Sequence, residues 1–295
     1  MSTRKPHTNG SETLHSMIIP FDPCTDDMLK LALAEDIGTG DITTNTVVPA
    51  TNTIHGSVIA KEAGIVCGLD VFTRVFFLLD RDVRVSPKIA DGDTVMAGTL
   101  IAEIDGPARP ILTGERVALN ILQRLSGIAT KTNKLVRMLA GTNTKVLDTR
   151  KTSPGLRVLE KYAVRMGGGS NHRMNLSDGI LIKDNHIKAA GSIEKAVAAA
   201  RANSPATLKV EVEVESIEQV KEALNANADI IMLDNMSVAL MAQAVALIGK
   251  KALTEASGNM NDRDLVEVAN TGVNFISVGA LTHSVQALDI SLKFH

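Results

Sequence analysis

The chain has 295 residues, of which 44% are hydrophobic, and its formal net charge at pH 7 is -2. This length allows two domains or one large α/β barrel, and the hydrophobic content is sufficient for a real core. No uninterrupted apolar stretch reaches the roughly 18 residues that a membrane span needs, and a chain with no Trp, one Tyr and no positive excess makes a nucleic-acid partner unfavourable.

The N-terminal end and the cysteines indicate the compartment. Residues 1–17 are polar and lack the apolar centre of a secretory signal. We expect them to form a disordered tail on a protein that stays in the cytoplasm. Cys24 and Cys67 are far apart and have no metal-type spacing, so we expect reduced thiols without a catalytic role.

Residues 18–127 are expected to form a first domain. Apolar residues recur at helical spacing in 26–35, behind the possible cap Thr25, and a glycine-containing turn follows at 35–43. From residue 54 the pattern changes to short strands, with turn signals at 91–93 and at Gly98. This pattern predicts a β-rich domain.

A long helical pattern follows at residues 113–141, where apolar residues recur on a helical period. If Thr113 opens this helix, Arg116 lies in the first turn, where a cation is unfavourable for the helix dipole. Two explanations stay open for that position. Arg116 either contacts an external anionic partner or forms a surface pair with Glu115.

Residues 128–282 alternate between strand and helix patterns, and alanine-rich helices lie between most of the strands. Repeated β/α units imply parallel strands, and a ring or near-ring of six or seven strands is the simplest way to close them. The candidate strands are 145–148, 179–183, 208–214, 229–233, 252–256 and 274–278.

Polar and charged residues follow each candidate strand. Because α/β barrels build their sites at the carboxyl ends of the strands, we expect these residues to meet at one mouth. They are Asp148 with Thr149, Arg150 and Lys151, then Lys183 with Asp184, Asn185 and His186, then 213–216, Asp234 with Asn235, Ser257 with Gly258 and Asn259, and Ser277 with Gly279 and Ala280.

A local basic excess points to an anion site. Residues 150–188 contain eight Lys or Arg against three Asp or Glu. Lys161 and Arg165 are spaced i,i+4 in a helical segment, so we expect them on a solvated basic face. The cations at the ends of apolar runs or beside glycines are expected to clamp an anion, since guanidinium and ammonium groups suit carboxylate and phosphate. These cations are Arg150, Lys151, Arg173 and Lys183.

Carboxylates and glycine turns complete the expected site. Glu213 and Asp234 can hold a magnesium ion that keeps several waters, and the turns at 257–259 and 277–280 offer backbone N–H groups to a phosphate. In the strand 210–215 three glutamates share one face, so they need basic partners, for which Lys183 and Arg150 are plausible. Glu211 is either a structural ion pair or part of the site.

The joint order of several fragments resembles the quinolinate phosphoribosyltransferase family, from about Leu29 to the C-terminus. In chain order the fragments after the EDIGTGDIT turn and the TGER helix start are DTRKT.PG, KYA, GGG.NHR, KDNH, VEVEV, IMLDN, SGN and FISVGALTH. The resemblance implies an α/β protein with an N-terminal α/β sandwich domain (18–127, joined by about 283–295). An incomplete barrel of about seven strands (128–282) follows, with its active site at the C-terminal edge. It also implies a homodimer in which Arg116 reaches into the partner's barrel.

By this resemblance the reaction converts quinolinate and phosphoribosyl pyrophosphate (PRPP) to nicotinate mononucleotide, pyrophosphate and carbon dioxide, with magnesium (Mg2+). Lys151, Glu213 and Asp234 are then catalytic, with magnesium and ribose hydroxyls on the two carboxylates. The residues implied for quinolinate are Arg116, Arg150, His172, Arg173 and Lys183. Those implied for phosphate are Lys151, Ser257, Gly258, Asn259, Ser277, Gly279 and Ala280.

Three other functions remain to be tested. Lys183 can be read as a Schiff-base nucleophile of a barrel aldolase, which requires a desolvated lysine. A divergent family member would act on another aromatic acid. A non-catalytic sensor of dicarboxylate or phosphate would bind the ligands without needing Glu213 and Asp234. The sequence assigns no dedicated acid to the decarboxylation, for which Lys151 is a hypothesis.

Overall fold

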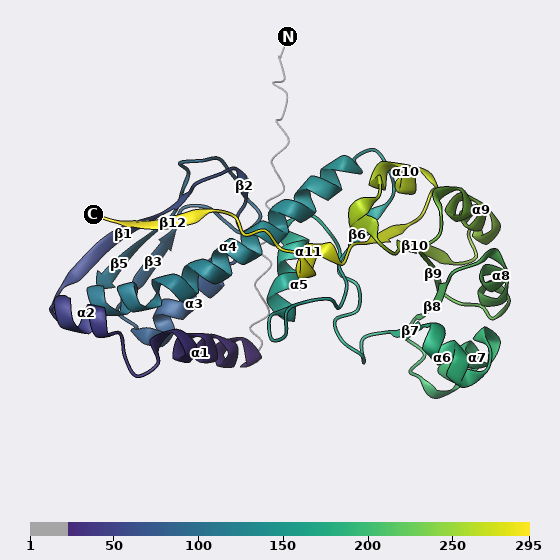
Figure 1. Cartoon of the computed structure of the whole chain (residues 1–295), viewed down its shortest axis with the longest axis horizontal. Coiled ribbons are helices and arrows are strands. Elements are labelled where there is room, and N and C mark those ends of the chain that lie inside the picture. Colours follow the sequence, from purple (N-terminus) through teal and green to yellow (C-terminus); the bar gives the residue numbers. More distant parts are fainter. Residues whose placement is uncertain (1–22) are drawn as a thin grey trace, which may run out of the picture.

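The computed structural model describes residues 23–295, so the predicted tail 1–17 lies outside the described residues. The chain forms two lobes, and the long helix α4 (Ala108–Met138) runs from the first lobe toward the second (Figure 1). The first lobe has an antiparallel sheet, and the second has a parallel sheet with helices on its outer side. The predicted α/β fold, a sandwich lobe followed by an incomplete barrel, is confirmed.

The first lobe is built on a four-stranded sheet with the order β12-β1-β5-β3, whose neighbours are antiparallel. Strand β12 pairs with β1, so the C-terminal end returns to the first lobe (Figure 1). The elements of this lobe are α1 (Pro23–Ile37), α2 (Ile42–Val47), β1 (Thr53–Ala60), β2 (Gly64–Ile65), α3 (Leu69–Leu79), β3 (Arg84–Pro87), β4 (Thr94–Val95), β5 (Leu100–Pro107) and β12 (Ile290–Phe294).

Helix α4 begins at Ala108, five residues before the predicted start at Thr113. Pro110 lies in its first turn, where the missing N–H causes no loss because the first N–H groups of a helix lack intrahelical partners. Arg116 is consequently the ninth helical residue, and the prediction that it lies in the first turn is wrong. The helix dipole therefore offers no argument about Arg116.

The second lobe contains a six-stranded parallel sheet with the order β6-β11-β10-β9-β8-β7. Each predicted strand is present, with ends that differ by up to two residues. The elements are β6 (Lys145–Leu147), α5 (Arg157–Met166), β7 (Ile180–Ile182), α6 (Asp184–Ala190), α7 (Ile193–Asn203), β8 (Val210–Val214), α8 (Ile217–Asn225), β9 (Ile230–Asp234), α9 (Val238–Ile248), β10 (Leu253–Ser257), the 3-10 turn η1 (Met260–Asp262), α10 (Leu265–Asn270), β11 (Phe275–Ser277) and α11 (Ala280–His283).

The barrel stays open between β6 and β7. In the described chain these two strands are the ends of the sheet, and β6 is extended only by a parallel bridge between Leu147 and Ser170. The prediction of about seven strands thus corresponds to six strands and this single bridge. The short segment after Ser170 occupies the position of the missing strand, and it carries His172 and Arg173.

Serine caps set the start of the helices that cover the sheet. Ser192, Ser216 and Ser237 each accept a hydrogen bond from the backbone N–H three residues later, at the starts of α7, α8 and α9. Such caps satisfy one of the unpaired N–H groups of the first turn. In β8 the valines are buried, while Glu211 and Glu213 alternate with them and point to the other face of the strand.

We find no helix within residues 23–295 that is both long and apolar enough to cross a lipid bilayer.

Candidate active site

A cavity of about 670 Å3 opens at the carboxyl ends of the parallel strands. The residues that the sequence assigns to the mouth of the barrel line it together, although they come from segments up to 130 residues apart. The predicted site residues that line this cavity are Arg150, Lys151, His172, Arg173, Lys183, Glu213, Asp234, Ser257, Gly258, Asn259, Ser277, Gly279 and Ala280.

Arg116 is the predicted site residue that this cavity does not include. It is exposed on α4, and it forms no ion pair with Glu115 or with any other described residue. A close ion pair with Glu115 is therefore not formed, although the charge of Arg116 opposes the rise in the pKa of Glu115 that burial causes. A single chain does not bring Arg116 to the other cations.

The guanidinium groups of Arg150 and Arg173 face the cavity as like charges. The Nε atoms of both are buried and have no hydrogen-bond partner within residues 23–295, although Arg173 Nη1 donates to the carbonyl oxygen of Gly179 at 3.0 Å. Burial lowers the pKa of Arg173, and the charge of Arg150 lowers it further. The charge of Glu211 opposes this shift in Arg173. Two neighbouring cations without an ion-pair partner in the described chain favour an anion that bridges them.

Lys183 and Glu213 form an ion pair at the mouth, so the predicted partnership of these two residues is confirmed. Glu213 ends β8, and Asp234 ends the adjacent strand β9. Asp234 accepts a hydrogen bond from the side chain of Asn235 at 2.7 Å. Two carboxylates from neighbouring strands thus reach the same cavity beside one exposed lysine.

The loop after β10 has no room for a side chain at Gly258. Gly258 has φ +91°, and a Cβ there would lie 2.2 Å from Oδ1 of Asn235. Asn259 also lies in the left-handed region, with φ +51°. At the end of β11, a Cβ on Gly279 would lie 3.0 Å from Cδ of Lys151. Because these glycines have no side chain, Asn235 can lie close to the backbone of Gly258, and the side chain of Lys151 can lie close to the backbone of Gly279.

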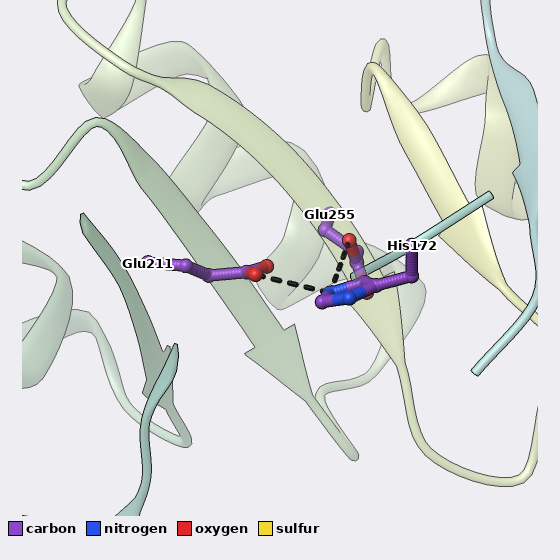
Figure 2. A group of neighbouring side chains, drawn as sticks. All are labelled: His172, Glu211 and Glu255. Carbon is purple, nitrogen blue, oxygen red and sulfur yellow. Dashed lines mark ion pairs between the residues drawn. The ribbon is translucent and has the colours of Figure 1, made fainter. Parts of the chain in front are cut away.

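His172 lies one layer deeper, where its ring meets two buried carboxyl groups (Figure 2). Its Nε2 is 3.0 Å from Oε2 of Glu211 and 3.7 Å from Oε2 of Glu255. The partner of Glu211 is thus His172, and the predicted pairing with Arg150 is not formed. The other ring nitrogen, Nδ1, accepts the backbone N–H of Arg173 at 2.7 Å.

The hydrogen bonds of this cluster define where its protons are. Burial raises the pKa of Glu255 to about 8, and the charge of Glu211 adds to this shift, so Glu255 is neutral at pH 7. Burial lowers the pKa of His172, and the hydrogen bond to the ionised Glu211 opposes that shift. The N–H of Arg173 opposes a second ring proton because it occupies Nδ1. The geometry therefore corresponds to a neutral ring that donates Nε2–H to Glu211.

The same trio has donor atoms within 4.8 Å of one another, a spacing that would also suit a metal ion. A metal-bound histidine donates its second ring N–H to an acceptor. In this protein Nδ1 faces a donor instead, the backbone N–H of Arg173. His172, Glu211 and Glu255 therefore form a hydrogen-bonded cluster and not a metal site. The magnesium prediction concerns Glu213 and Asp234 alone.

Lys161 corrects a prediction. Its side chain is fully buried and forms an ion pair with the equally buried Asp148, so the expectation of a solvated face is wrong for this residue. Burial lowers the pKa of Lys161 and raises that of Asp148, and the opposite charge of each partner counteracts the shift. The i,i+4 spacing with Arg165 identifies a shared helix face, but it does not reveal that α5 packs against α4 there.

Glu255 is a residue of the site that the sequence pattern does not predict. It lies inside β10 and is 1% exposed, and its side chain lines the mouth cavity. The available signal was a single acidic residue within the otherwise uncharged strand Leu253–Ser257, because a buried carboxyl needs a partner or a proton.

Comparisons with known proteins agree with this geometry. Residues 41–126 match the sequence model of the quinolinate phosphoribosyl transferase N-terminal domain. Residues 128–293 match the model of the C-terminal domain of the same family.

Individual relatives are similar over most of their length. The chain is 48% identical over 265 residues to the probable nicotinate-nucleotide pyrophosphorylase (carboxylating) of Bacillus subtilis, covering 90% of this chain and 91% of the relative. The crystal structure of NadC from Streptococcus pyogenes is 48% identical with a TM-score of 0.85, and 92% of this chain and 96% of that one are covered.

A third comparison gives the same result. The nicotinate-nucleotide pyrophosphorylase structure from Francisella tularensis is 44% identical, with a TM-score of 0.89, and the match covers 92% of this chain and 96% of that one. The two family matches together span both lobes, and they include every residue that lines the mouth cavity. The chain belongs to the quinolinate phosphoribosyl transferase family.

Proposed function

We propose that this enzyme transfers the phosphoribosyl group of PRPP to the ring nitrogen of quinolinate and releases carbon dioxide. The products are nicotinate mononucleotide and pyrophosphate, which is a step of NAD biosynthesis. The observation that carries the proposal is the mouth cavity, where Arg150, Arg173 and Lys183 meet the carboxylates Glu213 and Asp234. Quinolinate carries two carboxylates on adjacent ring carbons, so it requires several cations along one edge of the ring.

In the proposed complex the two carboxylates of quinolinate lie between the guanidinium groups of Arg150 and Arg173 and the ammonium group of Lys183. The buried, unpartnered Nε atoms of both arginines support this arrangement. A carboxylate between two guanidinium groups forms strong charge-assisted hydrogen bonds. His172 would lie beneath quinolinate at the floor of the cavity and contact its ring, since both nitrogens of His172 are already bonded within the chain.

Glu213 and Asp234 would hold magnesium and the ribose hydroxyls. Their donor set fits this hard cation, since both offer carboxylate oxygens at a mouth that water can reach. When bound, magnesium would neutralise the negative charge on the departing pyrophosphate. The carboxylates themselves would stabilise the positive charge that develops on the ribose carbon. When a quinolinate carboxylate pairs with Lys183, Glu213 would lose its ion-pair partner and become available to the magnesium ion and the ribose.

The turns after β10 and β11 would bind the phosphate groups of PRPP. Gly258 and Gly279 admit close approach of other groups, and Ser257, Asn259, Ser277 and Ala280 line the same side of the cavity. Lys151 lies against Gly279 and would stabilise the pyrophosphate as it leaves. Backbone N–H groups in such turns are common ligands of phosphate.

The second half of the reaction needs little from the protein. Once the ring nitrogen carries the ribose it is cationic, and this charge stabilises the carbanion left when the adjacent carboxylate departs as carbon dioxide. The protein has to position that carboxylate and exclude water from it. The carbanion must then take up a proton to give nicotinate mononucleotide, and Lys151 is our candidate for donating it.

Arg116 and the cellular location belong to the proposal as well. We place Arg116 in the site of a second copy of the chain, because it is exposed on α4 and outside its own cavity. The working unit would then be a homodimer. We place the enzyme in the cytoplasm, a reducing compartment in which the buried Cys67 stays a thiol.

The test is a turnover assay with purified protein, quinolinate, PRPP and magnesium, in which nicotinate mononucleotide and carbon dioxide are measured together. We expect both products from quinolinate and none from nicotinate, which lacks the second carboxylate. Arg173→Ala should reduce the rate by about 10²-fold or more, since a misplaced substrate reacts slowly. Arg201→Ala is the control, because Arg201 pairs with Asp229 outside the mouth cavity.

Other outcomes would assign a different function. Binding of quinolinate without turnover would support a sensor, and turnover of another aromatic acid would support a divergent enzyme. Borohydride trapping of Lys183 with a carbonyl substrate would support an aldolase. The structure argues against that last outcome, because the side chain of Lys183 is 44% exposed and paired with Glu213.

A further inference from the structure

The residues 170–173, which we call the NHR segment, carry His172 and Arg173 without belonging to a helix or strand. Its sheet-like contact in the described chain is the bridge of Ser170 to Leu147. A segment of this kind ordinarily has several conformations. Its two side chains nevertheless have to reach the mouth cavity in one arrangement if they bind a rigid dicarboxylate.

Both backbone groups of His172 are bound by the buried ion pair of Asp148 and Lys161. Asp148 Oδ1 accepts the N–H of His172 at 2.9 Å, and Lys161 Nζ donates to the carbonyl oxygen of His172 at 3.1 Å. The two charged groups also bond to each other. One buried pair therefore fixes the peptide units on both sides of His172.

Asn171 adds a third connection to the same pair. Its side-chain amide donates to Asp148 Oδ2 at 2.5 Å and to the backbone oxygen of Lys161 at 2.8 Å. Three segments are thus joined at one point: α5 through Lys161, the residue after β6 through Asp148, and the NHR segment through Asn171 and His172.

Stability alone does not explain this arrangement. Asp148 and Lys161 are both fully buried, and removing two charges from water ordinarily cancels most of what their attraction contributes. An apolar pair of similar size would hold α5 against the barrel equally well. It would leave the N–H and the carbonyl oxygen of His172 without partners, so the specific gain of the ion pair is the fixed NHR segment.

We propose that Asp148 and Lys161 are positioning residues that hold the NHR segment in the conformation that binds quinolinate. Neither residue lines the mouth cavity. Both therefore act on the substrate indirectly, through His172 and Arg173. This inference rests on the proposed function, because it takes quinolinate as the ligand of Arg173. It concerns quinolinate in particular, since the side-chain hydrogen bonds of the pair in residues 23–295 go to each other and to the NHR segment, and none goes to the phosphate turns after β10 and β11.

The test uses Lys161→Met in the full-length protein, with KM measured separately for quinolinate and for PRPP. We expect KM for quinolinate to rise about tenfold or more and KM for PRPP to change less than about twofold, because only the NHR segment loses its support. Lys161→Arg, which keeps the charge and the donors, should recover part of the quinolinate affinity. A general loss of stability would affect both substrates alike.

Lys161→Met leaves the charge of Asp148 buried and unpaired, so it is the variant at risk of misfolding. The double variant Asp148→Asn with Lys161→Met avoids an unpaired charge and should show the same selective effect. The matched control removes the pair Asp26 and Arg74 of the first lobe by Asp26→Asn with Arg74→Met. We expect that double variant to keep both KM values.

Two results would overturn the inference: unchanged KM values in the folded double variant, or equal changes for both substrates. Calorimetric binding of quinolinate to the parent protein separates this failure from a failure of the proposed function. A parent that neither binds nor converts quinolinate refutes the proposed function. If the parent and the double variant bind quinolinate equally well, only the positioning role is refuted.

Discussion

Charges of opposite sign occupy different depths of this barrel. Arg150 and Arg173 lie at the mouth, and the carboxyl groups of Glu211 and Glu255 lie one layer below. Glu255 stays protonated at pH 7, since burial raises its pKa to about 8. An ionised Glu255 would add a second negative charge beside Glu211 and His172, in the lining of the same cavity, and compete with the substrate for the arginines. The retained proton therefore keeps the arginines available for an external anion.

This charge arrangement predicts the pH dependence of stability. The pKa of Glu255 rises from an ordinary value of 4.5 in the unfolded chain to about 8 in the folded one. The folded state therefore binds the extra proton between these values, and its stability falls as the pH rises through this window. We expect Glu255→Gln to remove this loss, which is on the order of a few kcal/mol. Thermal denaturation of both proteins without ligands, from pH 5 to pH 8.5, measures it.

Glu103→Gln is the control for that experiment. The hydrogen bond and the charge of Lys88 lower the pKa of Glu103, so its contribution is present above pH 4.5 and is lost only as the pH falls below that value. The Glu103 variant should follow the parent protein across pH 5 to 8.5. Parallel curves for the parent and the Glu255 variant would show that Glu255 is ionised in the folded protein.

At the level of elements, the strands were predictable and the burial of helix faces was not. Short apolar runs such as β9 (Ile230–Asp234) end at polar residues, and both features are visible in the sequence. The burial of Lys161 depends on how α5 packs against α4, which local spacing does not determine. The predicted start at Thr113 leaves out the first five residues of α4, where Pro110 is tolerated because it lies in the first turn.

The same limit applies to the site. The charges at strand ends were found because barrel topology brings those ends together. Glu255 was missed because it precedes the strand end by two residues and gives no motif by itself. The role of Asn171 depends on the bridge between Ser170 and Leu147, a contact between segments 23 residues apart. Such contacts follow from the complete fold and leave little trace in local sequence.

The turn after β10 allows a prediction about PRPP. Gly258→Ala would place a Cβ 2.2 Å from Asn235 Oδ1 at φ +91°, so the turn has to move. We expect KM for PRPP to rise about tenfold or more while quinolinate binding persists, because misplaced N–H groups no longer fit the phosphate. Gly98→Ala is the control. It has nearly the same φ, +89°, and no heavy atom within 4 Å of the added Cβ.

If Gly98→Ala and Gly258→Ala change KM for PRPP equally, backbone strain accounts for the effect and the turn has no specific part in binding. Steady-state kinetics with each substrate varied in turn distinguishes these results.

At the scale of the molecule, one chain builds an almost complete site. The second lobe supplies the carboxylates, the phosphate turns and three of the cations proposed for quinolinate. The fourth, Arg116, is exposed on α4 and lies outside the cavity. Because isologous dimers place the same surface of each copy against the other, one copy can complete the site of its partner and receive the same residue in return.

Mixing two inactive variants tests this shared site. Arg116→Ala damages the partner's site, whereas Lys183→Ala damages the site of its own barrel. A mixed dimer then has one site with both defects and one intact site. After unfolding and refolding the variants together in equal amounts, half of the dimers are mixed, so we expect about a quarter of the parental activity. Activity that stays at the level of the separate variants would mean that Arg116 serves its own chain or lies outside the site.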